Sequence, residues 1–211
     1  MARKWEQDKP RLAHRLSKLE KATDDPMWLL IFPEGTNLSP TTRPKSVAFA
    51  KKEDIEMPKH ILLPRSTGLR FCLQNLSSSV RWVYDCTLAY EGVPAGGFPQ
   101  DYYTLRSLYF EGRPPTGVHM HWRKFHVDKI PLGEDQKEEF DKWLQDRFYE
   151  KDALLDDFYK HGSFTKEKIA VCVRTEVRLK NPIGDVFSIF AVLALVAVVG
   201  RIIVLLTRIF G

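Results

Sequence analysis

The hexapeptide at residues 32–37, Phe-Pro-Glu-Gly-Thr-Asn, holds the residue types best suited to chemistry. It follows an apolar run at residues 27–32 that predicts a buried strand. Glu34 would then stand at a strand end, where ligands bind in α/β sheets, and could accept a hydrogen bond from a substrate hydroxyl. Gly35 permits close backbone approach, and Thr36 or the next asparagine could cap the following segment. A plain strand-terminating turn is the alternative, because Pro, Glu and Gly all suit turns.

A second candidate segment lies at residues 63–68, Leu-Pro-Arg-Ser-Thr-Gly. Pro64 ends a short apolar run at residues 61–63. Leucines and a cysteine over residues 69–76 then recur at helical spacing. The start of that helix could hold an anion, with Arg65 adding guanidinium donors. An ordinary capped helix start is the alternative.

These two segments need a scaffold, which the hydrophobic pattern supplies. Helices are predicted within residues 1–25, 46–52, 69–76, 101–110 and 134–159, and strands at 27–32, 80–90 and 117–127. Short strands separated by helices predict an α/β domain, with a mixed sheet flanked by helices, over residues 1–163.

The composition of the 211 residues, 44% hydrophobic and 28% charged, fits a folded globular chain. The net charge of +5 suits phosphate-bearing ligands, anionic lipid surfaces or nucleic acid, and does not choose among them. Cys72, Cys86 and Cys172 are far apart and predict reduced core thiols, without a disulfide or a zinc site. The polar start at Met1 predicts no cleavable signal peptide.

The C-terminal part differs in composition. Residues 164–182 predict a basic linker, and residues 183–211 a transmembrane or membrane-associated helix. Residues 186–206 would span roughly 30 Å as a helix, which matches one bilayer core. The basic residues before this span place the preceding domain on the cytoplasmic side. A buried or interfacial helix is the alternative, because the uncharged core is short.

The residues around Glu34 resemble the third sequence block of the glycerol-3-phosphate and 1-acylglycerol-3-phosphate acyltransferases. The stretch around Pro64 resembles their fourth block, and Arg3-Lys4-Trp5 resembles the end of their second. Further similarity points to the lysocardiolipin and lysophosphatidylinositol acyltransferase subgroup. It is carried by residues 84–90 (Tyr-Asp-Cys-Thr-Leu-Ala-Tyr), the His-x-His strand at His119 and His121, and the helix containing Trp143.

This resemblance implies that Arg3, Glu34 and Gly35 bind the glycerol phosphate of the acceptor. We extend that substrate site to Thr36 and to Arg65. The same resemblance implies that Pro64 lies on the acyl-donor side of the site. The implied reaction transfers a fatty acyl group from acyl-CoA, a co-substrate, to a lysophospholipid hydroxyl, with no other cofactor. A histidine in the family acts as general base and an aspartate orients it. The implied location is a membrane, with the endoplasmic reticulum as the family-level expectation and the domain facing the cytosol.

One family feature is missing from these residues. The first block, H-x-x-x-x-D, requires an aspartate five positions after a histidine, and none of the six histidines has one. We therefore expect no catalytic residue in this chain and no activity from these residues alone. An N-terminally incomplete gene model is the favoured explanation, and an inactive paralogue is the alternative.

Two rival functions remain open. The chain could be a non-catalytic, membrane-associated protein that binds lipid or serves as a scaffold, or a single-pass membrane adaptor in which residues 32–37 form a mere turn. A metal site at His119 and His121 is not expected, because no cysteine or carboxylate completes the set. Nucleic-acid binding is not expected either, because no recognition motif accompanies the basic residues.

Overall fold

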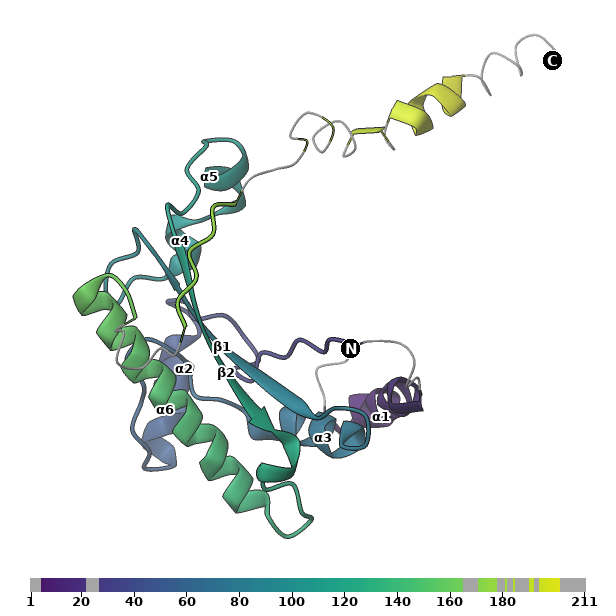
Figure 1. Cartoon of the computed structure of the whole chain (residues 1–211), viewed down its shortest axis with the longest axis vertical. Coiled ribbons are helices and arrows are strands. Elements are labelled where there is room, and N and C mark those ends of the chain that lie inside the picture. Colours follow the sequence, from purple (N-terminus) through teal and green to yellow (C-terminus); the bar gives the residue numbers. More distant parts are fainter. Residues whose placement is uncertain are drawn as a thin grey trace, which may run out of the picture. The chain divides into compact units, whose positions relative to one another are not determined.

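The computed structural model describes residues 5–21, 27–164, 171–177, 181, 184, 190–191 and 194–201. They fall in two compact units, residues 1–169 and 170–211. The elements of the first unit (Figure 1) are α1 (Trp5–Lys21), α2 (Arg43–Lys52), α3 (Ser66–Leu76), β1 (Trp82–Tyr90), α4 (Pro99–Tyr102), α5 (Leu105–Tyr109), β2 (Val118–His126), the 3-10 helix η1 (Val127–Lys129) and α6 (Lys137–His161). The predicted helices and the two later strands are confirmed.

The strands β1 and β2 form the sheet of the described residues. They pair antiparallel in a register that runs from Trp82 opposite His126 to Tyr90 opposite Val118. Residues 91–117, which include α4 and α5, connect them. The chain is thus mixed helix and strand, as predicted. The mixed sheet is not seen, because the two described strands make a purely antiparallel pair.

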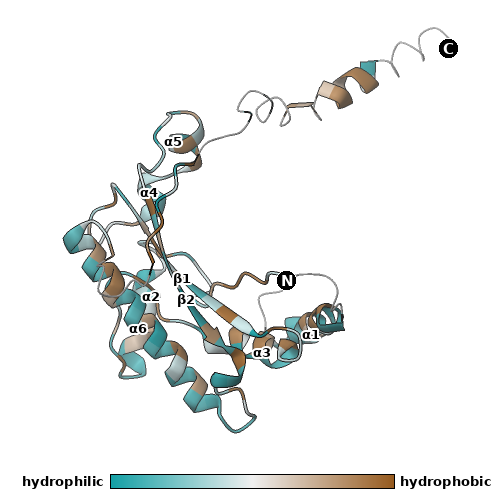
Figure 2. Ribbon diagram, viewed as in Figure 1, coloured by the Kyte–Doolittle hydropathy of each residue, from teal (hydrophilic) through white to brown (hydrophobic). Residues whose placement is uncertain are grey.

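Helix α6 covers one face of this hairpin (Figure 1). Hydrophobic and hydrophilic residues alternate along it in Figure 2, as expected for a helix with one buried side. Its first half packs against α3 and the end of β2, and its second half packs against Ala89 of β1 and Phe164. The buried side chains of α6 are Phe140, Leu144, Phe148, Lys151, Leu154, Leu155 and Phe158.

Helix α1 packs on α3 through a smaller cluster built from Leu16, Cys72 and Leu76. Leu16 is the buried residue of α1, so this amphipathic helix holds to the domain along a narrow stripe. The ring of Trp5 meets Phe71 edge-on, with their centroids 5.3 Å apart. The helix predicted near the start of the chain is therefore confirmed, together with its amphipathic character.

The second face of the hairpin is exposed and largely apolar. Side chains alternate between the faces of a strand, so every second residue of β1 and β2 shares this side. The large hydrophobic residues exposed on it are Trp82, Tyr84, Leu88, Val118, Met120 and Trp122. We call this set the outer sheet face.

The strand predicted at residues 27–32 is wrong. These residues have no regular secondary structure, and Figure 2 shows them as a hydrophobic, irregular stretch. Trp28 is 91% exposed and stacks on Tyr84 with 6.5 Å between the ring centroids. A strand requires a hydrogen-bonded neighbour, and neither described strand pairs with this segment. Its apolar residues are therefore not sufficient to make it a strand.

The predicted C-terminal helix lies mostly outside the described residues. Within it, residues 190–191 and 194–201 are helical. No helix among the described residues is long and apolar enough to cross a membrane. In the predicted basic linker, residues 171–177 have no regular secondary structure. The boundaries at residues 163 and 182 stay predictions.

Candidate functional site

The turn that carries Glu34 is closed by a backbone hydrogen bond. The Gly35 N–H donates to the Phe32 carbonyl over 3.0 Å. Gly35 has a φ of +68°, in the left-handed region that favours glycine. A Cβ added there would lie 3.6 Å from Cδ of Arg65, which is ordinary contact distance. The constraint on Gly35 is therefore its backbone conformation rather than space.

The two candidate segments lie in contact. The Arg65 N–H donates to the Pro33 carbonyl over 2.7 Å. Helix α3 begins at the next residue, Ser66, which confirms the predicted helix start. Leu62 and Leu63 are buried beneath this junction, and the Arg65 side chain is exposed. Glu34, Gly35, Pro64 and Arg65 therefore belong to one small region of the surface.

Glu34 is half-buried and electrostatically perturbed. Loss of hydration raises the pKa of its carboxyl above the ordinary value of 4.5. The negative charge of Asp85 raises it further, while a hydrogen bond from its own backbone and the positive charge of Lys151 act against the rise. Proximity to Asp85 and Lys151 places Glu34 beside the middle of β1.

A buried charge cluster formed by Asp85, Arg123 and Lys151 lies between the hairpin and α6. Arg123 donates to Oδ2 of Asp85 from Nη2 at 2.6 Å and from Nε at 3.2 Å. Lys151 pairs with Oδ1 of the same carboxylate and donates to the Cys86 carbonyl at 2.6 Å. The side chains are 17%, 20% and 11% exposed, in the order Asp85, Arg123, Lys151. Both carboxylate oxygens of Asp85 are thus satisfied by cations.

This cluster lies outside the site residues predicted from the sequence, although the pattern of α6 contains a signal for it. Leu144, Phe148, Leu155 and Phe158 mark the buried side of α6, and Lys151 falls on the same helical stripe. A lysine is almost never fully buried unless it is paired. Its place in an apolar stripe was therefore a detectable sign of a buried ion pair.

Thr36 does not cap the following helix. Its hydroxyl contacts only Oδ1 of Asn37, at 3.4 Å, among the described residues. Thr42 is the residue that precedes α2, and its hydroxyl donates to the Asn37 carbonyl at 2.7 Å. The Asn37 amide bonds Gln100 and so ties the Glu34 segment to α4. Arg3 lies outside the described residues.

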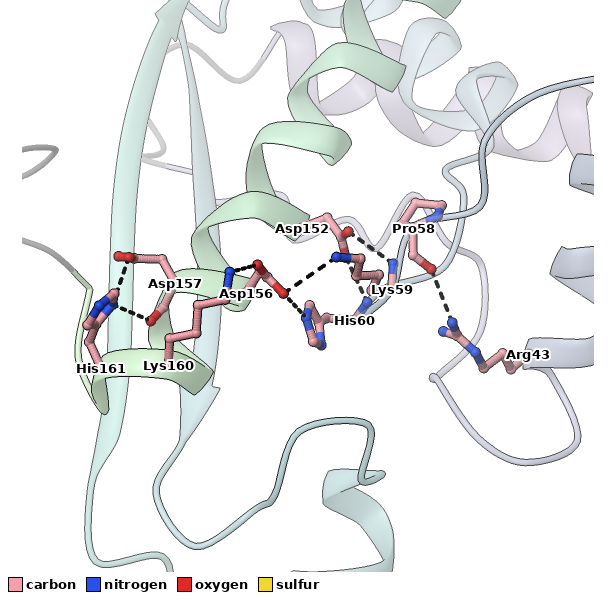
Figure 3. A network of polar contacts seen from close by, with 9 residues as sticks. All are labelled: Arg43, Pro58, Lys59, His60, Asp152, Asp156, Asp157, Lys160 and His161. Carbon is pink, nitrogen blue, oxygen red and sulfur yellow. Dashed lines mark hydrogen bonds and ion pairs between the residues drawn. The ribbon is translucent and has the colours of Figure 1, made fainter.

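A second polar network fixes the turn that leads to Pro64 (Figure 3). The two oxygens of Asp152 accept the backbone N–H groups of Lys59 and His60, at 2.9 and 2.6 Å. One turn further along α6, Asp156 pairs with Nε2 of His60 at 3.3 Å. Hydrogen bonds from Lys160 and His60 lower the pKa of Asp156 to about 2. The network holds the segment before Pro64 on α6.

His119 and His121, on β2, both contact side chains of the domain. Nε2 of His119 lies 2.9 Å from Oε1 of Glu91, and His121 packs against Phe164. Within the described ranges, no group of three or more His, Cys, Asp and Glu side chains could hold a metal ion. Cys72 is buried and burial raises its pKa.

One cysteine prediction needs correction. All three cysteines are free, but Cys86 is half-buried and Cys172 is exposed, so not every thiol lies in a core.

Comparison with known proteins identifies the family of this chain. A family model described as acyltransferase C-terminus matches residues 109–183. An uncharacterized acyltransferase of Schizosaccharomyces pombe is 36% identical over 200 residues, 95% of this chain and 55% of the relative. A 2-acyl-1-lysophosphatidylinositol acyltransferase of Saccharomyces cerevisiae is 37% identical, over 79% of this chain and 50% of the relative. The chain belongs to the glycerophospholipid acyltransferase family.

Other members of the family match similarly. Lysocardiolipin acyltransferase 1 of Gallus gallus is 32% identical over 84% of this chain and 45% of that protein. The chain spans about half the length of these curated relatives. No solved structure matches the chain. The family model takes in β2 and α6, and the longer match to the Schizosaccharomyces relative extends over the Glu34 turn as well.

Proposed function

We propose that this chain forms the acceptor-binding part of a lysophospholipid acyltransferase. The complete site would transfer a fatty acyl group from acyl-CoA to a free hydroxyl of the lysophospholipid. The observation that carries this proposal is the 2.7 Å hydrogen bond from Arg65 to Pro33, which brings the two motif segments together. The names of the relatives support the lipid acceptor, since they include acyltransferases for lysophosphatidylinositol and lysocardiolipin.

The chemistry has a defined balance. The acceptor hydroxyl oxygen attacks the thioester carbonyl carbon and gives its proton to a base, and an ester C–O bond forms. The C–S bond breaks, and coenzyme A leaves as a thiolate that takes up a proton. Glu34 orients the hydroxyl-bearing glycerol unit by accepting a hydrogen bond, Gly35 and Thr36 allow it to approach, and Arg65 supplies donors to its phosphate. Pro64 shapes the acyl-donor side. Arg3 belongs to the same proposal by resemblance alone.

The base is not proposed among these residues. No histidine here is followed five positions later by an aspartate. Loss of general-base assistance typically costs on the order of 100- to 10,000-fold in rate. We therefore propose that the 211 residues bind substrate and transfer acyl groups poorly or not at all when assayed alone. A non-catalytic lipid-binding protein is the second candidate, and the same missing pair favours it.

Membrane association belongs to the proposal as well. The acceptor is a membrane lipid, and the net charge of +5 suits an anionic lipid surface. The predicted membrane helix at residues 183–211, the cytosolic orientation and the endoplasmic reticulum are carried forward as parts of this proposal.

An acyl-transfer assay tests the function. Transfer of labelled acyl groups from acyl-CoA to lysophospholipids of different head groups would be measured in two proteins. One is the 211-residue chain, and the other is the same chain joined to the part of the Saccharomyces relative that it does not match. Transfer by the joined protein alone supports the proposal. Transfer by the unjoined 211-residue chain contradicts the proposal that these residues contain no catalytic base. Lipid binding without transfer in either protein favours the second candidate.

A substitution tests the role of Glu34. Glu34→Gln in the joined protein should lower kcat/KM about 10- to 100-fold, because a hydrogen bond to a charged group contributes about 1.5–3 kcal/mol. Glu138→Gln is the matched control, since Glu138 is exposed in the first turn of α6. Equal rates for Glu34→Gln and the unsubstituted protein would remove Glu34 from the acceptor site.

A further inference from the structure

A small cavity lies beside the Glu34 segment and is lined by three basic side chains. Its volume is about 100 Å³, and Arg43, Lys59 and His60 contribute to its wall. The backbone at Gly96–Gly97 and the ring of Tyr159 form other parts of the wall. The segment that follows Glu34, the turn held by α6 and the connection between the strands therefore converge here. None of the roles assigned above uses this cavity.

Arg43 is the cation of this cavity with the most unused hydrogen-bonding capacity. It is half-buried at the first residue of α2. Its Nη2 donates to the Pro58 carbonyl at 3.3 Å (Figure 3), and this is its side-chain hydrogen bond within the described part of the chain. No carboxylate of the described residues pairs with it. A guanidinium carries five N–H donors, so most of them are available to a ligand.

Lys59 and His60 are held through their backbone N–H groups, and Asp156 contacts both of their side chains. Asp152 accepts both of their N–H groups, and Asp156 lies 3.8 Å from Nζ of Lys59. Asp156 is shared with Lys160, at 2.5 Å (Figure 3). Among the described residues, the cavity wall holds the cations Arg43 and Lys59 and no carboxylate, while Lys160, Asp152, Asp156 and Asp157 lie in the network behind it. The wall itself is therefore positively charged.

We propose that this cavity binds a phosphate group of a substrate through Arg43, Lys59 and His60. A guanidinium fork with an ammonium beside it matches the tetrahedral oxygens of a phosphate. The volume of about 100 Å³ leaves room for a phosphate group. The rest of the ligand would extend outside. This inference rests on the proposed function for the source of the phosphate, which is either the lysophospholipid head group or coenzyme A.

Calorimetric titration of the 211-residue chain tests the proposal without any acyl transfer. The probes are inorganic phosphate, glycerol 3-phosphate, coenzyme A and 3′-dephospho-coenzyme A. Arg43→Gln should weaken binding of at least one organic probe about tenfold, and Arg43→Lys should restore part of it. Arg11→Gln is the matched control, because Arg11 is exposed on α1, and it should change each Kd less than about twofold.

A second variant guards against a folding defect. Lys59→Gln leaves the backbone bonds to Asp152 in place, and the side chain is 73% exposed, so the fold should persist. It should weaken the same probe about threefold or more, because one phosphate-contacting charge is lost. Circular dichroism melting would verify that each variant is folded.

The probes also distinguish the two sources of phosphate. Dependence on Arg43 with glycerol 3-phosphate assigns the cavity to the lipid and moves the acceptor phosphate there from Arg65. Dependence with coenzyme A that is lost with the dephospho form assigns it to the 3′-phosphate of the donor. The proposal is overturned if the Kd of every probe is the same in Arg43→Gln, in Lys59→Gln and in the unsubstituted chain. Phosphate binding through Arg43 together with no acyl transfer by the joined protein would instead refute the proposed function alone.

Discussion

Lys151 occupies a position where the helical pattern of α6 calls for a hydrophobic side chain. Its ammonium group neutralises Asp85 and bonds the Cys86 carbonyl, and Arg123 neutralises the other oxygen of Asp85. The triad lies beside Glu34, since the charges of Lys151 and Asp85 both act on that carboxyl. A buried pair contributes little net stability, but removal of one partner leaves a costly buried charge.

Lys151→Met is expected to lower the free energy of unfolding by about 2–4 kcal/mol, since Asp85 would lose one of its two cations in a largely desolvated position. Urea unfolding measures this loss. The control Lys142→Met replaces an exposed lysine of the same helix and should change stability by less than about 0.5 kcal/mol. The double variant Asp85→Asn with Lys151→Met should lose less than the sum of the single losses. Additive losses would show that the two groups are not coupled.

The raised pKa of Glu34 makes a testable pH dependence. The folded chain holds this proton more tightly than the unfolded chain, so the contribution of Glu34 to stability is fully present below the ordinary pKa of 4.5 and is lost as the pH rises through the folded pKa. Glu34→Gln has no such proton to lose. The difference in unfolding free energy between this variant and the unsubstituted chain should therefore shift in favour of the variant between pH 4 and neutrality. A difference independent of pH would show that Glu34 is solvated normally.

The candidate residues could be predicted from sequence only in part. Glu34, Gly35, Pro64 and Arg65 were found because they stand in short motifs next to apolar runs, and their contact follows from one hydrogen bond that no pattern encodes. Asp85 and Arg123 were missed because a single charged residue within a strand resembles a solvated one. Only the cross-strand register, which places them opposite each other, reveals the pair.

Among the elements, the helices were the most predictable. The residues of α3 and α6 repeat at helical spacing, and that period belongs to the local chain. The segment at residues 27–32 was mispredicted because a strand depends on its neighbours, and a short apolar run does not identify them. Pairing of β1 with β2 was likewise invisible locally, since residues 91–117 separate them.

Asp152 controls the element that leads into Pro64. Asp152→Ala should destabilise the chain by about 1–3 kcal/mol, because the N–H groups of Lys59 and His60 would lose their acceptor. Hydrogen exchange at these two amides should accelerate as well. Asp152→Asn keeps one acceptor oxygen and should lose less. Asp146→Ala, at an exposed position of the same helix, serves as the control. Equal exchange rates in both alanine variants would show that Asp152 does not protect these two amides.

At the scale of the whole molecule, the outer sheet face is the most conspicuous exposed surface. It groups Trp82, Tyr84 and Leu88 of one strand with Met120 and Trp122 of the other. An apolar patch of this kind promotes association in water. Because these positions are solvent-exposed, a polar substitution there should cost little folding free energy.

Met120→Lys should therefore reduce self-association of the isolated chain, measured by sedimentation velocity over a range of concentrations. Its free energy of unfolding should stay within about 0.5 kcal/mol of the original value. Gln7→Lys adds the same charge at an exposed position of α1 and should leave association nearly unchanged. Equal effects of the two variants would mean that net charge, rather than this face, governs association.

The connection at residues 91–117 separates two tasks in one hairpin. The register of β1 and β2 is fixed by their own alternation and by α6, whereas the connection supplies Gly96 and Gly97 to the cavity wall. Lengthening a flexible connection is thermodynamically mild, about 0.6 kcal/mol for each doubling. Exchange of this segment between relatives would thus change the cavity wall while the paired strands and α6 stay in place.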